Sequence, residues 1–275
     1  MADRKLFVVV IRTPNSDRYQ PIKALLENDK RFELEYLDAS MTPTYLDVAS
    51  RHIAYSTEMF EFFHGRKLAP AEIGCADSHN RARKLIQNRE DGGIILEDDA
   101  RITNVDSLFN MAINFLSSEK LNYSILSLTG FRQIGLKNSS EHLLEINKYI
   151  KLWGNPDLAV SYVLTNKSAD ELLKSNQPVK DVSDWPITKC KFFVPIVPLV
   201  QHGESNNNSL IDSTVSNFRN NESFLKKVIK LMFIKYLIKR PKGLTIFHYI
   251  GIVYGKKIKW RYDYIRVKSQ LEYMK

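Results

Sequence analysis

Three consecutive carboxylates follow a short apolar stretch in the first half of the chain. Residues 93–96 read GIIL, which is typical of a buried strand, and Glu97, Asp98 and Asp99 come directly after it. In an extended backbone, Glu97 and Asp99 would point to one side and Asp98 to the other. Hard oxygen donors at a strand end suit Mg²⁺ or Mn²⁺ bound to a diphosphate. The stretch therefore indicates a cation site, with an ordinary acidic turn as the simpler alternative.

A second motif lies upstream of these carboxylates. Residues 70–86 read PAEIGCADSHNRARKLI, and residues 95–100 read ILEDDA. The block EIGC-x-x-SH, followed by a helix and then by ILEDD, resembles the pattern of glycosyltransferase family 25. That family includes bacterial lipooligosaccharide β-galactosyltransferases and the related collagen galactosyltransferases. Weaker similarity extends over roughly residues 5–212.

The resemblance implies a GT-A fold, a nucleotide-sugar donor, a divalent cation and inversion at the anomeric carbon. Mn²⁺ (or Mg²⁺) would stabilise the nucleoside diphosphate as it leaves. We expect Asp99 to bind this cation directly, with Glu97 as a further ligand. Alternatively, Glu97 or Asp98 contacts a metal-bound water or the ribose. His202, in a polar loop, is the candidate third ligand, unless it is an ordinary surface histidine.

The predicted donor-binding residues lie at the ends of predicted strands and along the motif helix. The pair Ile11-Arg12 stands where the family usually has Asn-Leu, which is a departure from the pattern. Arg18 is either a phosphate ligand or a solvated charge, and His79 is either a donor ligand or a structural hydrogen bonder. Cys75 is interpreted as a small buried apolar side chain. The predicted set is Ile11, Arg12, Arg18, Asp38, Gly74, Ser78, His79, Glu97 and Asp98.

Inversion by a single displacement needs one carboxylate that deprotonates the acceptor hydroxyl. This group must lie across the sugar from the diphosphate, and therefore away from the acidic cluster. The segment DVSDWP offers Asp184 as the first choice and Asp181 as the second. The alternative for either residue is a solvated loop acid or a helix cap.

Apolar and amphipathic segments alternate, which predicts an α/β fold: a GT-A-like (Rossmann-like) mixed sheet flanked by helices. Residues 191–200 contain two prolines and predict an edge or irregular strand. The two cysteines lie far apart, so a disulfide framework or a structural zinc site is not expected. Further strands are expected at 6–11, 32–40, 93–97, 123–130 and 159–166, and helices at 45–63, 71–90, 107–118 and 167–175.

The charge of the chain is concentrated at its C-terminal end. Residues 223–275 hold 14 Lys or Arg and two acids, a net +12, whereas the whole chain has +9 and the rest therefore −3. We expect a catalytic domain over 1–222 and a basic, apolar and aromatic helical tail over 223–275. Such a tail suits an anionic membrane surface, although packing on the catalytic domain is the alternative. With no signal peptide and no spanning segment, the expected location is cytoplasmic, peripheral on the inner face of the cytoplasmic membrane.

The leading hypothesis is an inverting, metal-dependent transfer of galactose from UDP-galactose, in β linkage, to a lipid-linked lipooligosaccharide or lipopolysaccharide acceptor. The first alternative is a UDP-glucose or UDP-N-acetylhexosamine transferase of the same fold. The second is a non-enzymatic protein that binds membrane or nucleic acid through its basic tail, but no nucleic-acid-binding motif is present and no nucleic-acid partner is expected. Phosphoryl transfer is disfavoured because the P-loop pattern is missing. A receiver-like domain is disfavoured because its acid pair follows the first strand.

Overall fold

The computed structural model describes residues 5–58, 60–61, 66–129, 134–136, 149–151, 156, 158–183, 186, 188–195, 197–203 and 264–266. Asp184 and nearly all of the predicted tail, 223–275, lie outside these residues, so the tail's helices and its membrane contact stay predictions. The described part of the tail is a short strand, β11 (Tyr264–Arg266), which pairs with β6 (Ile134–Leu136). Among the described residues, no helix has the length and apolar character needed to cross a bilayer.

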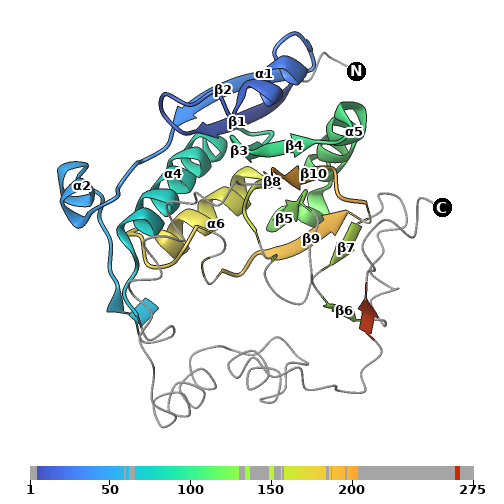
Figure 1. Ribbon diagram of the computed structural model, residues 1–275. Coiled ribbons are helices and arrows are strands. Elements are labelled where there is room, and N and C mark those ends of the chain that lie inside the picture. The colour runs from blue at the N-terminus through green and yellow to red at the C-terminus, as the bar shows by residue number, and fades with distance from the viewer. Residues whose placement is uncertain are drawn as a thin grey trace.

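A seven-stranded mixed sheet forms the centre of the fold, in the order β2-β1-β3-β8-β5-β9-β7 (Figure 1). This confirms the predicted mixed α/β architecture. Strands β1, β2 and β3 are parallel neighbours, whereas β8 runs antiparallel to both β3 and β5. The strands are β1 (Leu6–Arg12), β2 (Phe32–Asp38), β3 (Gly93–Glu97), β5 (Ser124–Ser127), β7 (Tyr149–Lys151), β8 (Ser161–Leu164) and β9 (Lys191–Pro195).

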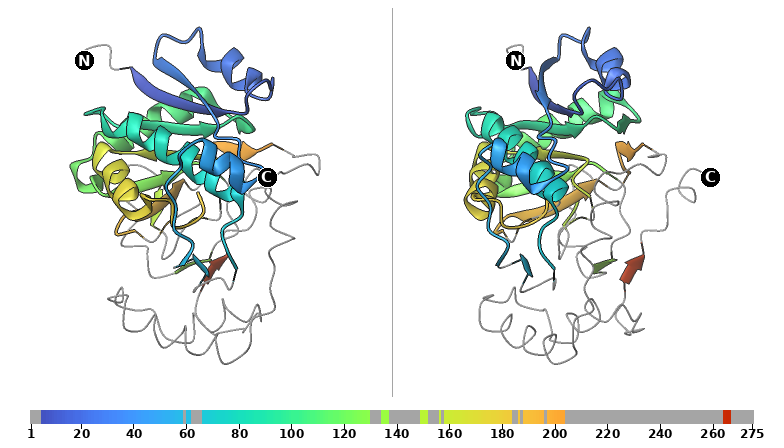
Figure 2. Two further views of the ribbon diagram at one scale, coloured as in Figure 1. Left: turned by 90° about the vertical axis from the view of Figure 1, so that its left-hand side faces the viewer. Right: turned by 60° about the vertical axis from the view of Figure 1, so that its left-hand side comes forward.

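Helices cover both faces of this sheet because its inner strands are apolar on both sides. Along β1, Val8 and Val10 pack with helices α1 (Gln20–Leu26) and α5 (Val105–Leu116). Phe7 and Val9 pack with α4 (Pro70–Gln87) and α6 (Asn166–Asn176) on the opposite face. Figures 1 and 2 show α4 and α6 side by side on one side of the sheet, with α5 on the other. Successive side chains of a strand point to opposite faces of the sheet, so their position along β1 decides which pair of helices they contact.

Two predicted elements differ from the structure. The helix predicted over 45–63 is interrupted. Helix α2 (Tyr45–Ser50) covers its first part and ends because His52 adopts a φ of 54°, in the left-handed region that terminates helices, and the backbone is helical again at residues 58 and 60–61. The segment 191–200 is irregular, as one of the two predicted alternatives has it, but it is not a sheet edge: β9 lies between β5 and β7 and ends at Pro195. The chain then enters a separate strand, β10 (Val200–His202).

Helix α4 carries the EIGC-x-x-SH motif and is held against the chain that follows β2. The Glu72 carboxylate accepts a hydrogen bond from the Ala69 backbone N–H at its first turn, at 2.8 Å. At Gly74, an added Cβ would lie 2.1 Å from the backbone oxygen of Ser40 and equally close to Thr42 Oγ1. The motif glycine therefore permits a close approach of backbone to helix.

Replacing Gly74 by alanine is expected to destabilise the protein by about 1–3 kcal/mol. Alanine adds about 1 kcal/mol of helix propensity, but the Cβ has no room, because one of the two atoms it meets is a backbone oxygen. Urea denaturation measures the difference. Lys84→Ala, on the exposed side of the same helix, is the control and should change stability by less than about 0.5 kcal/mol. Equal midpoints for Gly74→Ala and wild type would contradict the close approach.

Candidate active site

The carboxyl ends of three parallel strands meet at one edge of the sheet. Arg12, Asp38 and Glu97 are the last residues of β1, β2 and β3, respectively. Register places Arg12 opposite Asp38, and the Arg12 Nε donates a hydrogen bond to Asp38 Oδ1 at 2.7 Å. Open α/β sheets bind ligands at this edge. The predicted donor-binding residues from β1, β2 and β3 are thus brought together by strand pairing.

The three acidic residues do not follow strand alternation. Strand β3 ends at Glu97, and Asp98 and Asp99 form a turn into the short strand β4 (Ala100–Ile102). Glu97 keeps the orientation of Ile95 and faces α4, where it contacts His79. Asp98 Oδ2 accepts a hydrogen bond from the Thr13 backbone N–H at 2.8 Å. A turn therefore replaces the extended backbone after Glu97, and the negative charge of Glu97 still acts on Asp99, whose pKa it raises.

Arg18 joins the other two carboxylates. Its Nη2 lies 2.8 Å from Asp99 Oδ2 and 3.3 Å from Asp98 Oδ1. The guanidinium side chain is 49% exposed, whereas both carboxylates are buried. A cation at the surface thus offsets part of the repulsion between two buried anions and still has donors to offer to an anionic ligand.

His202 reaches Asp99 through a strand pairing that the sequence does not reveal. Strand β10 runs antiparallel to β4, with His202 opposite Ala100, and the Gly203 backbone N–H donates to the Asp99 carbonyl oxygen at 2.8 Å. As a result, His202 Nε2 lies 3.2 Å from Asp99 Oδ2. The two residues predicted to share a cation are neighbours although they are distant in the sequence.

The Asp99 carboxylate is buried next to two other negative charges. Burial raises the pKa of Asp99, and the negative charges of Glu97 and Asp98 raise it further, against the lowering effects of His202 and Arg18. Asp99 Oδ1 is buried, and no donor among the described residues reaches it. A buried carboxylate oxygen without a partner is costly. A divalent ion ligated there would remove that cost, so Asp99 and His202 fit the implied Mn²⁺ or Mg²⁺.

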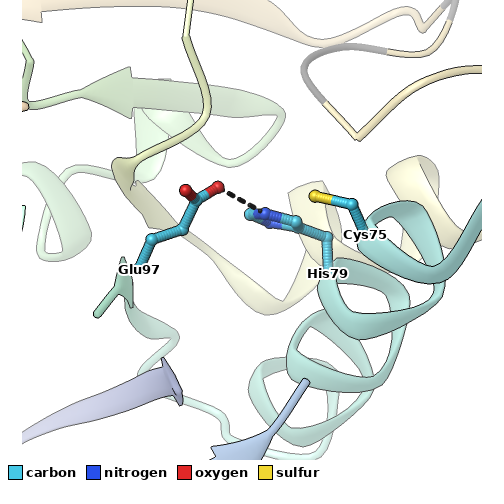
Figure 3. Close-up of side chains that lie close together, drawn as sticks. All are labelled: Cys75, His79 and Glu97. Atoms are coloured by element: carbon cyan, nitrogen blue, oxygen red, sulfur yellow. Dashed lines mark hydrogen bonds and ion pairs between the residues drawn. The ribbon is translucent and has the colours of Figure 1, made fainter. Parts of the chain in front are cut away.

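Glu97 has a different environment. The His79 Nε2 lies 2.9 Å from Glu97 Oε1, and the His79 Nδ1 lies 2.8 Å from the Tyr162 hydroxyl. Burial by itself would raise the pKa of Glu97, but the hydrogen bond and the charge of His79 outweigh it, so the pKa is lowered. Burial raises the pKa of Tyr162 to about 12, which keeps its hydroxyl protonated. Glu97 is therefore held as a carboxylate at the end of a hydrogen-bonded chain that runs from Tyr162 through His79. Figure 3 shows the contact between His79 and Glu97.

The remaining predicted residues lie around this centre. Ile11 is buried in the sheet, directly opposite Glu97 in register. The Ser78 hydroxyl accepts from the Ser40 backbone N–H, which holds α4 to the chain after β2, and donates to the Gly74 carbonyl oxygen one turn earlier in the same helix. The Asp181 Oδ1 accepts from the Val182 backbone N–H, and Asp184 lies outside the described residues.

Arg83, and the contacts that it and Cys75 make with Ser183, were missed in the sequence. Cys75, His79 and Arg83 share one helix face at i, i+4 and i+8. Cys75 is partly exposed, not a fully buried apolar side chain, and its Sγ lies 3.2 Å from Ser183 Oγ. The buried Arg83 donates from Nη2 to the Ser183 carbonyl oxygen at 3.0 Å. The spacing of four residues along a helix was the signal that could have placed these side chains on one face. It could not show that Ser183 would pack against that face.

The fold is a mixed α/β sheet with a cluster of acidic, basic and imidazole side chains at the carboxyl edge of its parallel strands. The chain matches the model of glycosyltransferase family 25, described as a lipopolysaccharide biosynthesis protein family, over residues 5–187, two thirds of its length. It belongs to this family and is a glycosyltransferase of lipopolysaccharide biosynthesis. Among curated proteins, a search finds no match to the chain.

Replacing Asp99 by asparagine is expected to raise the melting temperature of the metal-free protein at pH 7. Because the folded-state pKa of Asp99 is raised, its ionisation costs stability above that pKa, and the cost disappears as the pH falls through it. The advantage of the variant should therefore shrink toward about pH 4. Thermal unfolding in excess chelator measures both effects.

The exposed Asp17→Asn is the matched control and should show no such advantage at pH 7. A metal-free Asp99→Asn protein that melts below wild type at pH 7 would mean that the ion pairs with Arg18 and His202 outweigh the burial of the charge.

Proposed function

We propose that this glycosyltransferase is inverting and metal-dependent, and that it transfers galactose from UDP-galactose, in β linkage, to a lipid-linked oligosaccharide acceptor. Membership of the family supports a nucleotide-sugar donor and an oligosaccharide acceptor. The observation that carries the metal is the buried, unpartnered Oδ1 of Asp99 beside His202, at the carboxyl edge of the parallel strands.

Asp99 and His202 would hold the cation, with Asp98 beside them. A carboxylate together with an imidazole is a mixed oxygen and nitrogen set, which favours Mn²⁺ over the oxygen-ligated Mg²⁺. The bound ion would supply charge stabilisation to the departing diphosphate. Arg18, which contacts both carboxylates and is half-exposed, would add a guanidinium to the same diphosphate.

The acceptor hydroxyl needs a base that removes its proton. Asp184 remains the first choice for this base, with Asp181 second. The chain leading to them packs on the site's side of the sheet: Ser183 contacts Cys75 and Arg83 of α4, one helical turn on either side of His79. His79 in turn contacts Glu97. Ser183 thus approaches the site from the side of α4, whereas Asp98 and Asp99 contact Thr13 and Arg18. This supports a base from the same segment, on the side of the site away from the diphosphate.

A donor screen in the presence of Mn²⁺ tests the metal and the sugar together. With a lipopolysaccharide oligosaccharide acceptor, we expect UDP release from UDP-galactose, loss of that release in EDTA, and recovery on adding Mn²⁺. Asp99→Asn should lower kcat/KM by about 100-fold or more, because charge stabilisation of the leaving group is lost. The exposed Asp106→Asn, on α5, is the matched control and should keep full activity.

Turnover that survives both EDTA and Asp99→Asn would reject the metal assignment. Faster turnover of UDP-glucose or of a UDP-N-acetylhexosamine would replace the proposed donor while leaving the metal intact.

A pair of identical substitutions tests the base. Asp184→Asn should lower kcat by about 10²–10⁴-fold with little change in the dissociation constant of UDP-galactose, because the base acts on the acceptor hydroxyl. Asp181→Asn is the matched comparison, three residues earlier in the same segment. Single-turnover kinetics and donor titration separate the two quantities. Loss in Asp181→Asn alone would assign the base to Asp181, and full activity in both would exclude the segment.

A further inference from the structure

Beside the proposed cation site lies a second cluster of possible ligands. Cys75 and His79 come from one face of α4, and Glu97 comes from the end of β3 across from them (Figure 3). One ligand atom from each residue, a sulfur, an imidazole nitrogen and a carboxylate oxygen, lies within 4.8 Å of the other two. We propose that Cys75, His79 and Glu97 bind a thiophilic divalent cation of the Zn²⁺ class, at a site separate from the hard cation site at Asp99.

The donor set is the first argument. Thiolate, imidazole and carboxylate are the ligands that Zn²⁺ takes, and they lie about 3–4 Å apart around a tetrahedral ion. Cys75 and His79 are four residues apart on a helix, so they already face the same way. A thiolate and a carboxylate together carry two negative charges, which balance the ion, and the thiol proton of Cys75 leaves to solvent when the metal binds.

The surroundings are the second argument. A metal-bound histidine is held by a partner on its other nitrogen. Here the His79 Nδ1 has the Tyr162 hydroxyl at 2.8 Å, and the two rings stack with an interplanar angle of 19°. The Ser183 hydroxyl lies 3.2 Å from the Cys75 sulfur and can donate to a thiolate. The hydrogen-bond partners of both ligands, Tyr162 for His79 and Ser183 for Cys75, are thus already in position.

Access is the third argument. His79 is 1% exposed, but the Glu97 side chain is 27% exposed and Cys75 is partly exposed. An ion can therefore enter from the side of Glu97 and Cys75, and a water molecule can complete the tetrahedron. The ion would take the Glu97 carboxylate away from its hydrogen bond with His79 and add positive charge next to Asp99. Occupation of this site is thus expected to inhibit transfer and to weaken the binding of Mn²⁺.

Cobalt titration of the full-length, metal-stripped protein tests the site without using activity. Co²⁺ replaces Zn²⁺ and gives a thiolate-to-metal charge-transfer band in the near ultraviolet only when sulfur is a ligand. We expect the intensity of this band to saturate at one Co²⁺ per chain, and added Zn²⁺ to remove the band. Cys75→Ser should abolish it, whereas Cys190→Ser should keep it, because the only other cysteine is buried against α6. Asp99→Asn should also keep it.

Two further measurements do not depend on cobalt. Zn²⁺ should protect Cys75, and Mn²⁺ should not, from alkylation followed by mass spectrometry. Tyr162→Phe should weaken Zn²⁺ binding by roughly 10- to 100-fold through the loss of the outer partner. Absence of the band in wild type, its survival in Cys75→Ser, or its loss in Asp99→Asn would each overturn the proposal.

Discussion

Repulsion among three neighbouring carboxylates is the constraint on which this site depends. Burial of Asp98 and Asp99 beside Glu97 would be prohibitive without compensation. The chain supplies that compensation from three separate places: Arg18 before the first helix, His202 from a late strand, and His79 on α4. This compensation is incomplete at Asp99 Oδ1, which has no hydrogen-bond donor among the described residues. This shortage of positive charge is what supports the proposed cation and the proposed anionic donor.

The architecture assigns different tasks to the three acids. Because β3 ends at Glu97 and the chain turns there, Glu97 faces α4 whereas Asp98 and Asp99 face Arg18. One side of the cluster thus carries the proposed cation and diphosphate site, and the other is joined to a buried histidine and tyrosine. The family's motif contains both parts: the helix block provides the histidine, and the strand block provides the acids. The two blocks are separated along the chain by the rest of α4, the turn after it and β3, which brings the chain back to the same edge of the sheet.

Much of the fold could be predicted from local patterns. The alternation of strands and helices, the buried β1 and β3, and the motif helix α4 follow from apolar periodicity and from Gly and Pro positions. The length of α2 could not be predicted, because its end depends on a left-handed residue, His52, in a segment that is still amphipathic. The inner position of β9 could not be predicted either, since strand order is decided by pairing partners and not by the strand's own composition.

The sequence by itself determined the chemistry available at the site: three acids after an apolar strand, a motif with cysteine and histidine four residues apart, and a late histidine in a polar loop. Only the tertiary structure decided which of these meet. Pairing of β10 with β4 brings His202 to Asp99, and the packing of α4 on the sheet brings His79 and Cys75 to Glu97. The physical reason is that residue types and local periodicity are properties of short segments, whereas contacts between distant segments depend on strand order and on which face of each element is buried.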